Sequence, residues 1–183
     1  MADATRDVTI RQVLTAVGRL QVADSPGDEP ALVLMHGFPD DSRIYDRLVP
    51  LLSPRRAVTF DFLGYGASDR PQAGALDPAG HLHQLAAVLD ELGIETAVLV
   101  GHDASGPLAI DYALTAPERV GQLALLNTYY GHAPALRLPE MIRLLADPGM
   151  TPLADAMLGD PDQRMWLLGH TARRGDSAGT SRL

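Results

Sequence analysis

Residues 101–106, Gly-His-Asp-Ala-Ser-Gly, have the types and spacing of a reactive turn. Asp103 follows an apolar run and precedes a helical pattern, which is where a nucleophile elbow presents its reactive side chain. Because such a turn is strained and brings backbones close together, it needs small residues two positions before and after the nucleophile. Gly101 and Ser105 occupy those positions. The spacing therefore predicts that the carboxylate of Asp103 is a nucleophile.

This segment has two other interpretations. An aspartate directly before a helix is often an N-cap, and Ser105 is a rival nucleophile. The serine elbow has the pattern G-x-S-x-G, however, and Asp103 stands where its first glycine should be. We therefore expect Ser105 to be a small packing residue that also hydrogen-bonds locally. The context given by two other segments favours a nucleophile over an N-cap at Asp103.

Two glycine-containing loops precede the elbow in the chain, HGFPDD at residues 36–41 and DFLGYGASDRP at residues 61–71. Each follows a predicted strand. Together with the elbow they resemble the α/β-hydrolase superfamily, and within it the branch with an aspartate nucleophile, the epoxide hydrolases and haloalkane dehalogenases. The resemblance covers roughly residues 9–130. It implies an α/β-hydrolase fold in which Asp103 is the nucleophile.

The resemblance also implies supporting roles around the nucleophile. In the family, the residue after the His-Gly pair and the residue after the nucleophile offer backbone N–H groups to an oxyanion, which places these roles on Phe38 and Ala104. Preorganised donors of this kind are worth about 3 to 4 kcal/mol. We expect His36 to shape the oxyanion turn rather than transfer protons, and the GYGASD loop to be scaffold. The other residues expected to support the turn and the elbow are Gly37, Gly101, His102, Ser105 and Gly106.

In this family the aspartate displaces a halide or opens an epoxide, and water then cleaves the alkyl-enzyme ester. That water needs a histidine base held by an acid, and the family places both groups after late strands of the sheet. The candidates for the base are His81, His83, His132 and His170. None follows a late predicted strand, so we expect surface or loop roles for them. The general base and the acid are accordingly expected to be absent from this chain.

The substrate markers of the family are incomplete. Epoxide hydrolases and haloalkane dehalogenases commonly carry Trp beside the nucleophile, where this chain has Ala104, and its one Trp, Trp166, falls in a predicted cap. The HGFP segment favours the epoxide hydrolases, although their paired cap tyrosines cannot be placed. Tyr129 and Tyr130 are expected to pack at the start of the cap.

Alternating elements are expected to position these loops. Alternation of polar and apolar residues from Thr9 to Asp24 predicts two strands, and apolar runs predict strands at residues 31–36, 57–62, 97–102 and 121–127. The runs at 31–36 and 97–102 are expected to be buried, whereas the sixth strand, at 121–127, is expected to be a sheet edge in a chain without later strands. Helical spacing predicts helices at residues 42–52, 79–93 and 105–120. Asp41 or Ser42 is expected to cap the first helix, and Gly93 to end the second. This order predicts an α/β fold, a mostly parallel sheet flanked by helices.

The chain divides into three predicted parts. Residues 1–130 form the N-terminal part of an α/β-hydrolase core, and residues 131–169 form a partial helical cap that is broken by prolines. Residues 170–183 are polar and without pattern, and are expected to be a disordered tail. Three of the 15 arginines lie in this tail among Gly, Ser, Ala and Thr, which suggests a truncation or frameshift after about residue 169. A natural small domain is the alternative.

Composition restricts the function classes. The chain has 183 residues, 46% of them hydrophobic, a net charge of -8 and no cysteine, which indicates a soluble globular protein of the cytoplasm without disulfides, a zinc site or a thiol nucleophile. There is no signal-peptide pattern, no membrane-spanning run and no basic face for nucleic acid. The expected partner is a small-molecule substrate, with no cofactor and no metal. The sequence gives no indication of the oligomeric state.

Two functional hypotheses follow. In the first, the protein is a hydrolase whose aspartate nucleophile forms an alkyl-enzyme ester from an epoxide or alkyl halide. In the second, the chain is a catalytically silent, truncated hydrolase fragment or a binding protein that lacks the base and the acid of the triad. Whether this chain alone is an enzyme stays open at this point.

Overall fold

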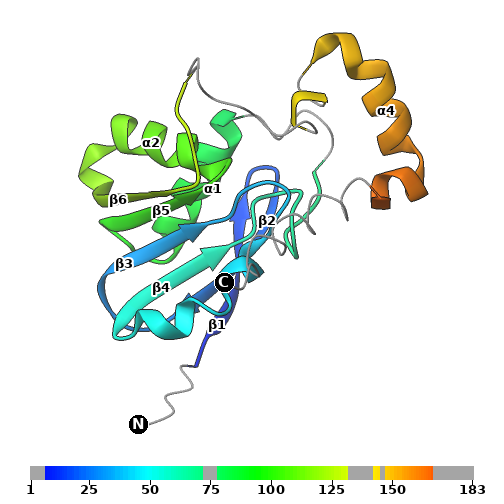
Figure 1. The fold of residues 1–183 in the computed structure, drawn as a ribbon. Helices are drawn as coiled ribbons and strands as arrows, with labels where there is room; N and C mark the ends of the chain where they lie inside the picture. Colours follow the sequence, from blue (N-terminus) through cyan, green and yellow to red (C-terminus); the bar gives the residue numbers. More distant parts are fainter. Residues whose placement is uncertain (1–6, 72–77, 132–141, 145–146, 167–183) are drawn as a thin grey trace, which may run out of the picture. The chain divides into compact units, whose positions relative to one another are not determined.

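The computed structural model describes residues 7–71, 78–131, 142–144 and 147–166. The chain separates into two compact units, residues 1–131 and residues 132–183. The first unit contains a six-stranded sheet with the strand order β1-β2-β4-β3-β5-β6 (Figure 1). This is the α/β architecture that the sequence predicted.

The sheet begins with an antiparallel hairpin and continues as a parallel sheet. The hairpin consists of β1 (Thr9–Thr15) and β2 (Gly18–Ser25), and β2 pairs antiparallel with β4 (Arg55–Phe60). The parallel part adds β3 (Asp28–Met35), β5 (Ala97–His102) and β6 (Val120–Leu126). The six predicted strands are confirmed, with ends that differ by a few residues.

Two α-helices and five strands share the larger hydrophobic cluster of the first unit. Helix α1 (Pro78–Glu91) contributes Leu85, Val88 and Leu89, and α2 (Ser105–Thr115) contributes Leu108. Helix α1 packs against β1, and α2 against β5 and β6. A smaller cluster contains Leu34, Tyr45 and Ala57, so the sheet buries side chains in two separate cores. The chain has enough apolar residues to cover both faces of the central strands.

Helix α1 ends as the sequence predicted. Gly93 has φ +62°, a left-handed conformation that glycine adopts without a Cβ penalty. The N–H of Ile94 then donates to the carbonyl of Leu89 at 2.8 Å, which satisfies a carbonyl at the helix end.

The predicted helix at residues 42–52 is wrong in type. The segment forms two short 3₁₀ helices, η1 (Ser42–Tyr45) and η2 (Val49–Leu52). Pro50 has no N–H to donate, and its ring clashes with the carbonyl four residues before it in an α-helix. The N–H of Leu51 instead donates to the carbonyl of Leu48 at 2.8 Å, the tighter 3₁₀ spacing. The predicted cap is confirmed, because Asp41 accepts a hydrogen bond from the N–H of Arg43.

Strand β6 lies at one edge of the sheet. It pairs with β5, and no further strand of the described chain pairs with its other side. Its side chains are largely accessible, including Leu123, Leu125 and Leu126, which are 38–43% exposed. This is the edge position expected for the sixth strand, and the accessibility of its side chains follows from it.

The second unit contains helical segments in the residues that the structure describes. These are η4 (Pro148–Met150) and α4 (Thr151–Gly159), followed by a helical stretch over residues 161–166. Helix α4 starts at a proline-containing first turn, where the missing N–H costs nothing. The predicted tail at residues 170–183 lies outside the described residues, as do His132 and His170. None of the helices in the described ranges is both long enough and apolar enough to cross a membrane.

The three loops that the sequence singled out all follow the carboxyl ends of parallel strands. Strands β3, β4 and β5 run parallel, so their carboxyl ends lie together. They are followed by residues 36–41, by residues 61–71 and by the turn at Asp103. The three segments that the sequence singled out are therefore neighbours in space.

Candidate active site

The turn at Asp103 joins β5 to α2 in a strained conformation. Asp103 has φ +50°, which for a residue with a Cβ costs about 1 to 3 kcal/mol. Hydrogen bonds on both sides hold it: its N–H donates to the carbonyl of Leu126 at 3.0 Å, and its carbonyl accepts from the N–H of Gly106 at 3.1 Å. The hydroxyl of Thr128 donates to the same carbonyl at 2.6 Å. The end of β6 thus fixes the turn that presents the carboxylate.

Close packing explains the small residues of the turn. A Cβ at Gly101 would lie 2.9 Å from the Cα of Gly106 and 3.0 Å from the Cβ of Ala109. A Cβ at Gly106 would collide with the side chain of Thr128. The steric argument from the sequence therefore holds at both glycines.

The Asp103 carboxylate is turned towards the loop after β3. The backbone N–H of Phe38 donates to Oδ2 of Asp103 at 3.0 Å. Gly37 makes this approach possible, because a Cβ there would lie 2.5 Å from the Cβ of Asp103 and 2.8 Å from Oδ2. Among the described residues, no hydrogen bond is made to Oδ1. One carboxylate oxygen is therefore held by the backbone, and the other has no hydrogen-bond partner in the described ranges.

The N-cap interpretation of Asp103 is excluded. Helix α2 starts at Ser105, its N-cap residue is Ala104, and no side chain caps it. Ala104 is exposed, and within the described part of the chain its N–H has no acceptor. The backbone N–H of Phe38 therefore binds Oδ2 of Asp103. The backbone N–H of Ala104, the next residue after Asp103, is left without an acceptor among the described residues.

The hydroxyl of Ser105 is engaged inside the fold. Ser105 is buried, and its Oγ lies 2.8 Å from the carbonyl of Met35 and 2.9 Å from that of His102, to which it can donate. It also accepts from the N–H of His102 at 2.9 Å. One side chain therefore links β3, β5 and α2. His102 is partly buried, and its Nδ1 has no hydrogen-bond partner within the described ranges.

His36 is held as a neutral ring. The N–H of Phe62 donates to Nε2 at 3.2 Å, so Nε2 carries no proton, and Nδ1–H donates to the carbonyl of Gly37 at 2.8 Å. Burial lowers the pKa of His36 below its ordinary value, against a smaller opposing effect of the Gly37 hydrogen bond. Both nitrogens are committed to backbone groups, and the ring shapes the turn that carries Phe38.

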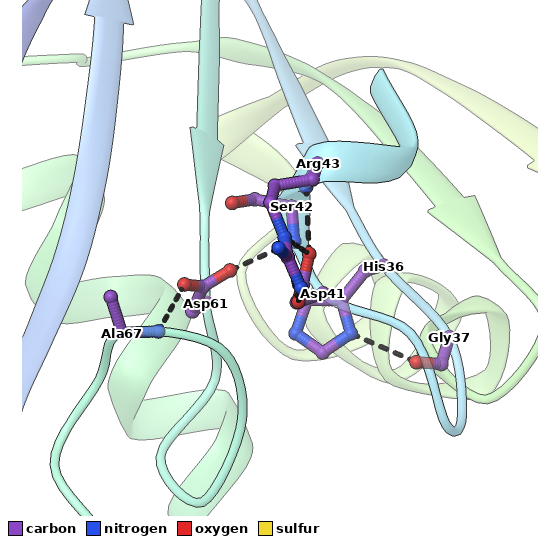
Figure 2. A network of polar contacts seen from close by, with 7 residues as sticks. All are labelled: His36, Gly37, Asp41, Ser42, Arg43, Asp61 and Ala67. Atoms are coloured by element: carbon purple, nitrogen blue, oxygen red, sulfur yellow. Dashed lines mark hydrogen bonds and ion pairs between the residues drawn. The ribbon is translucent and has the colours of Figure 1, made fainter. Parts of the chain in front are cut away.

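Asp61 ties the two loops together, as Figure 2 shows. The N–H of Ser42 donates to its Oδ1 and the N–H of Ala67 to its Oδ2, both at 2.8 Å. The hydroxyl of Ser68 donates to its carbonyl at 2.6 Å. The carboxylate is 4% exposed and joins the loop after β3 to the loop after β4. A buried carboxylate with these partners makes the two loops one rigid piece.

A cavity of about 200 Å³ lies beside the elbow. Its walls come from the oxyanion turn, the loop after β4 and helices α1 and α2. The lining residues are His36, Gly37, Phe38, Phe62, Tyr65, His81, Ala104, Ser105, Pro107, Leu108 and Asp111. The lining is mainly apolar with a few polar groups, as is usual for a small-molecule site.

The surface or loop role expected for His81 is wrong. His81 lies on α1 and lines the cavity, and its ring centroid is 5.1 Å from that of Phe62. Its neighbour His83 is exposed. The expected packing of Tyr130 is also wrong, since the side chain is 54% exposed and its hydroxyl donates to Oδ1 of Asp111 at 2.8 Å.

Three residues at the site were not predicted from the sequence. Tyr65 lies in a loop whose glycines suggested scaffold alone, Asp111 lies on α2 two turns after the elbow, and Thr128 follows β6. The helical spacing of residues 104, 107, 108 and 111 could have placed Asp111 on the face of Ala104. Among the described residues, no group of three or more His, Asp or Glu side chains is arranged to hold a metal ion.

Comparisons with known proteins agree with this geometry. The family model described as the alpha/beta hydrolase fold matches residues 30–159. The chain is 30% identical over 132 residues to haloalkane dehalogenase 2 of Mycobacterium tuberculosis (strain CDC 1551 / Oshkosh), covering 72% of this chain and 46% of that protein. It is 38% identical over 107 residues to fluoroacetate dehalogenase of Burkholderia sp, covering 55% of this chain and 35% of that protein.

A solved structure shows the same similarity. The epoxide hydrolase from an endophytic Streptomyces superposes with a TM-score of 0.62 at 32% sequence identity, over 78% of this chain and 43% of that one. The chain thus spans less than half the length of each of these three proteins.

Proposed function

The chain belongs to the alpha/beta hydrolase fold family, and on that premise we propose that Asp103 attacks a carbon electrophile and forms an alkyl-enzyme ester. The substrate class is an epoxide or an alkyl halide. The names of the dehalogenase and epoxide hydrolase relatives support this class.

The hydrogen bond from the Phe38 N–H to Oδ2 carries the proposal. A serine nucleophile needs its oxyanion donors vacant for the substrate's oxygen, whereas a carboxylate brings an oxygen of its own to them. Oδ2 is therefore the oxygen that stays in place, and Oδ1 is the one that attacks. Its lone pair forms the O–C bond, and the electron pair of the broken bond leaves with the halide or the epoxide oxygen.

The same donor serves the second step. When water adds to the ester carbon of Asp103, negative charge develops on Oδ2, which already faces the N–H of Phe38. Preorganised donors at that position are worth about 3 to 4 kcal/mol. The water needs a base, and His36 cannot supply one because both of its nitrogens are bound to backbone groups. We therefore expect ester formation to outpace ester cleavage in this chain.

Intact-mass measurement tests the proposal. The chain is incubated with styrene oxide or with benzyl bromide, weighed and mapped by peptide analysis. We expect one adduct, on Asp103, that is lost in Asp103→Asn and retained in Asp155→Asn, a control carboxylate exposed on α4. An unmodified Asp103 with both reagents contradicts the proposal.

The second hypothesis, a chain that binds without turnover, is favoured by the commitment of His36 to backbone groups. The same experiment separates the two. Reversible binding leaves the mass unchanged, a single stable adduct supports a nucleophile without an effective base, and steady release of diol or alcohol shows that a base is present. In the last case His81→Gln identifies it, because His81 lines the same cavity.

A further inference from the structure

One wall of the cavity beside Asp103 is a face of helix α2 and the turn before it. The lining residues of this wall are Ala104, Pro107, Leu108 and Asp111. Their spacing of three and four positions puts them on one side of the helix. The α-helix rises about 1.5 Å per residue, so Asp111 lies about 9 Å along the axis from Ser105, the first residue of α2. A carboxylate therefore stands at the end of this wall that is remote from the reacting turn.

The carboxylate of Asp111 is held on one oxygen only. The hydroxyl of Tyr130 donates to Oδ1 at 2.8 Å, and Oδ2 accepts no hydrogen bond from the described part of the chain. Asp111 is partly buried, and none of the ion pairs among the described residues includes it. Taking an ionised carboxylate partly out of water is unfavourable unless a partner replaces the water. Oδ2 can therefore accept a positively charged partner from the cavity.

The rest of the described lining supplies no fixed positive charge. It includes no Arg or Lys. The ring of His36 is neutral, because both of its nitrogens are bound to backbone groups. Burial first, and the negative charge of Asp103 second, raise the pKa of Tyr65 above its ordinary value, so its phenol is uncharged at neutral pH. The carboxylates of Asp103 and Asp111 thus give the cavity a negative potential.

We propose that Asp111 selects substrates that carry a positive charge. The inference rests on the function proposed above and narrows its substrate class to epoxides or alkyl halides with an ammonium group a few bonds from the reactive carbon. Oδ1 of Asp103 attacks that carbon at one end of the wall, and the ammonium group lies against Asp111 at the other. Asp111 forms and breaks no covalent bond, so its role is in specificity.

The apolar residues between the two carboxylates fit this arrangement. Pro107 and Leu108 line the cavity between the reacting turn and Asp111, where they can contact the uncharged carbon chain of a substrate. Like charges repel, so the same two carboxylates disfavour an anionic substrate. When Asp103 becomes an uncharged ester, Asp111 is the carboxylate that keeps the ammonium group in place.

Two epoxides of the same shape test the assignment. One is glycidyltrimethylammonium, and the other is its neutral isostere, in which a tert-butyl group replaces the trimethylammonium group. The second-order rate of Asp103 adduct formation is measured with each by intact mass. The two epoxides differ in intrinsic reactivity, so only the change of their rate ratio between protein variants is compared. The measurements are made at about pH 8, because a histidine is ordinarily neutral there and His81 also lines the cavity.

Asp111→Asn removes the charge and keeps the size of the side chain. We expect it to lower the ratio of the cationic to the neutral rate by about 5-fold, the size expected of a partly exposed ion pair. The neutral epoxide should react equally fast in both proteins, and Asp111→Glu, which keeps the charge, should keep the preference. The matched control is Glu91→Gln, which removes the same charge from the exposed end of α1, outside the cavity lining. It should leave the ratio unchanged.

The other outcomes contradict the inference. Equal slowing of both epoxides in Asp111→Asn shows a structural role for the carboxylate, and an unchanged ratio shows that the cation does not reach it. An equal fall of the ratio in Glu91→Gln shows an effect of net charge alone.

Failure of the proposed function is distinct, because the unmodified chain would then form no Asp103 adduct with either epoxide. Binding of benzyltrimethylammonium, a cation without an epoxide or a halide, is therefore measured by calorimetry as well. Weaker binding to Asp111→Asn than to the unmodified chain supports the inference without any reaction at Asp103. Equal binding to the two proteins, or none to either, contradicts it.

Discussion

Gly37 sets the distance at which the oxyanion turn meets the nucleophile. An added methyl group would lie 2.5 Å from the Cβ of Asp103, where real Cβ atoms are not found, so one of the two segments must move. We predict that Gly37→Ala slows Asp103 alkylation by about 100-fold, the usual cost of displacing a reacting group by about 1 Å. The measurement is the rate of adduct formation by mass spectrometry.

Gly159→Ala is the control for this prediction. A Cβ at Gly159 meets nothing within 4 Å, and the residue lies on α4. Its adduct rate should match that of the unmodified chain. A Gly37→Ala protein that reacts at the normal rate would show that the contact with Asp103 is not needed.

His36 gives the fold a dependence on pH with a definite sign. Its pKa is lowered in the folded chain by burial, so the unfolded chain takes up a proton more readily. The stability contributed by the neutral ring is present above about pH 6.5 and is lost as the pH falls, by at most about 1.4 kcal/mol per pH unit. We predict that the free energy of unfolding decreases more between about pH 7.5 and pH 5 in the unmodified chain than in His36→Asn.

Denaturant unfolding at both pH values measures this difference. The variant is expected to be less stable at each pH, and only the change between the two pH values within one protein is compared. Equal decreases in the two proteins would mean that His36 takes up its proton equally well in the folded chain.

The small residues around Asp103 were predictable from the sequence because a tight turn has no room for larger side chains. Gly101 and Ser105 flank Asp103 at positions where backbones approach, and this requirement is local. Tyr65 and Thr128 reach the site through tertiary contacts between loops far apart in the chain, and local sequence carries no record of those contacts. The tight turn at Asp103 was therefore predictable, whereas the residues that lie beside it in space were not.

At the scale of elements, Ser105 fastens one helix to two strands. Its hydroxyl serves the carbonyl of Met35 on β3 and the backbone of His102 on β5. We predict that Ser105→Ala lowers the free energy of unfolding by about 1 to 3 kcal/mol, because buried backbone groups lose their partner. Asp103 alkylation of the folded variant should persist, since Asp103 and not Ser105 is the proposed nucleophile.

The matched control is Thr115→Ala, which removes a hydroxyl at the exposed end of α2. It should change the free energy of unfolding by no more than about 0.5 kcal/mol. Denaturant unfolding measures the free energy of unfolding of each variant, and intact-mass measurement detects the adduct. Loss of the adduct in folded Ser105→Ala would show that the serine, and not Asp103, is the nucleophile.

Strands were predictable because their apolar runs are bounded by turn residues, and helix α1 because Leu85 and Leu89 recur on one face. The segment at residues 42–52 shows the limit of such patterns. Its apolar spacing suits an α-helix, but Pro50 removes one N–H donor. The remaining hydrogen bonds join residues three apart in the chain, as in a 3₁₀ helix. Periodicity indicates which side chains face inward, and backbone chemistry decides the helix type.

At the scale of the whole molecule, the edge strand β6 offers a surface on which two chains could pair. Its outer edge has backbone groups without a partner strand in the described chain, and Leu125 is 43% exposed. Exposed apolar edges promote pairing between molecules, and a lysine there opposes it. We predict that the chain self-associates with increasing concentration and that Leu125→Lys raises the monomer fraction.

Sedimentation velocity over a range of concentrations measures the monomer fraction. Leu114→Lys is the control, because Leu114 is 68% exposed and belongs to α2 rather than to the edge strand. A chain that is monomeric at all concentrations, or equal effects of the two substitutions, would contradict a role for the edge.

The parallel pairing of the later strands followed from the alternation of strands and helices, whereas the order of the strands in the sheet did not. The sequence of β6, VGQLALL, is as apolar as that of a central strand, and its edge position was inferred from the lack of later strands rather than from its own pattern. Burial of a strand depends on what packs beside it, which a local pattern does not contain.

The buried carboxylate of Asp61 has a stereochemical consequence. By joining the loop that carries Phe38 to the loop that carries Tyr65, it fixes two walls of the cavity beside Asp103 relative to each other. A rigid wall built from L-amino acids is asymmetric, so it leaves the two mirror-image forms of a chiral substrate unequal room beside the carboxylate. For a chiral epoxide, we therefore expect one mirror-image form to bring its ring carbon to Asp103 and the other to react more slowly.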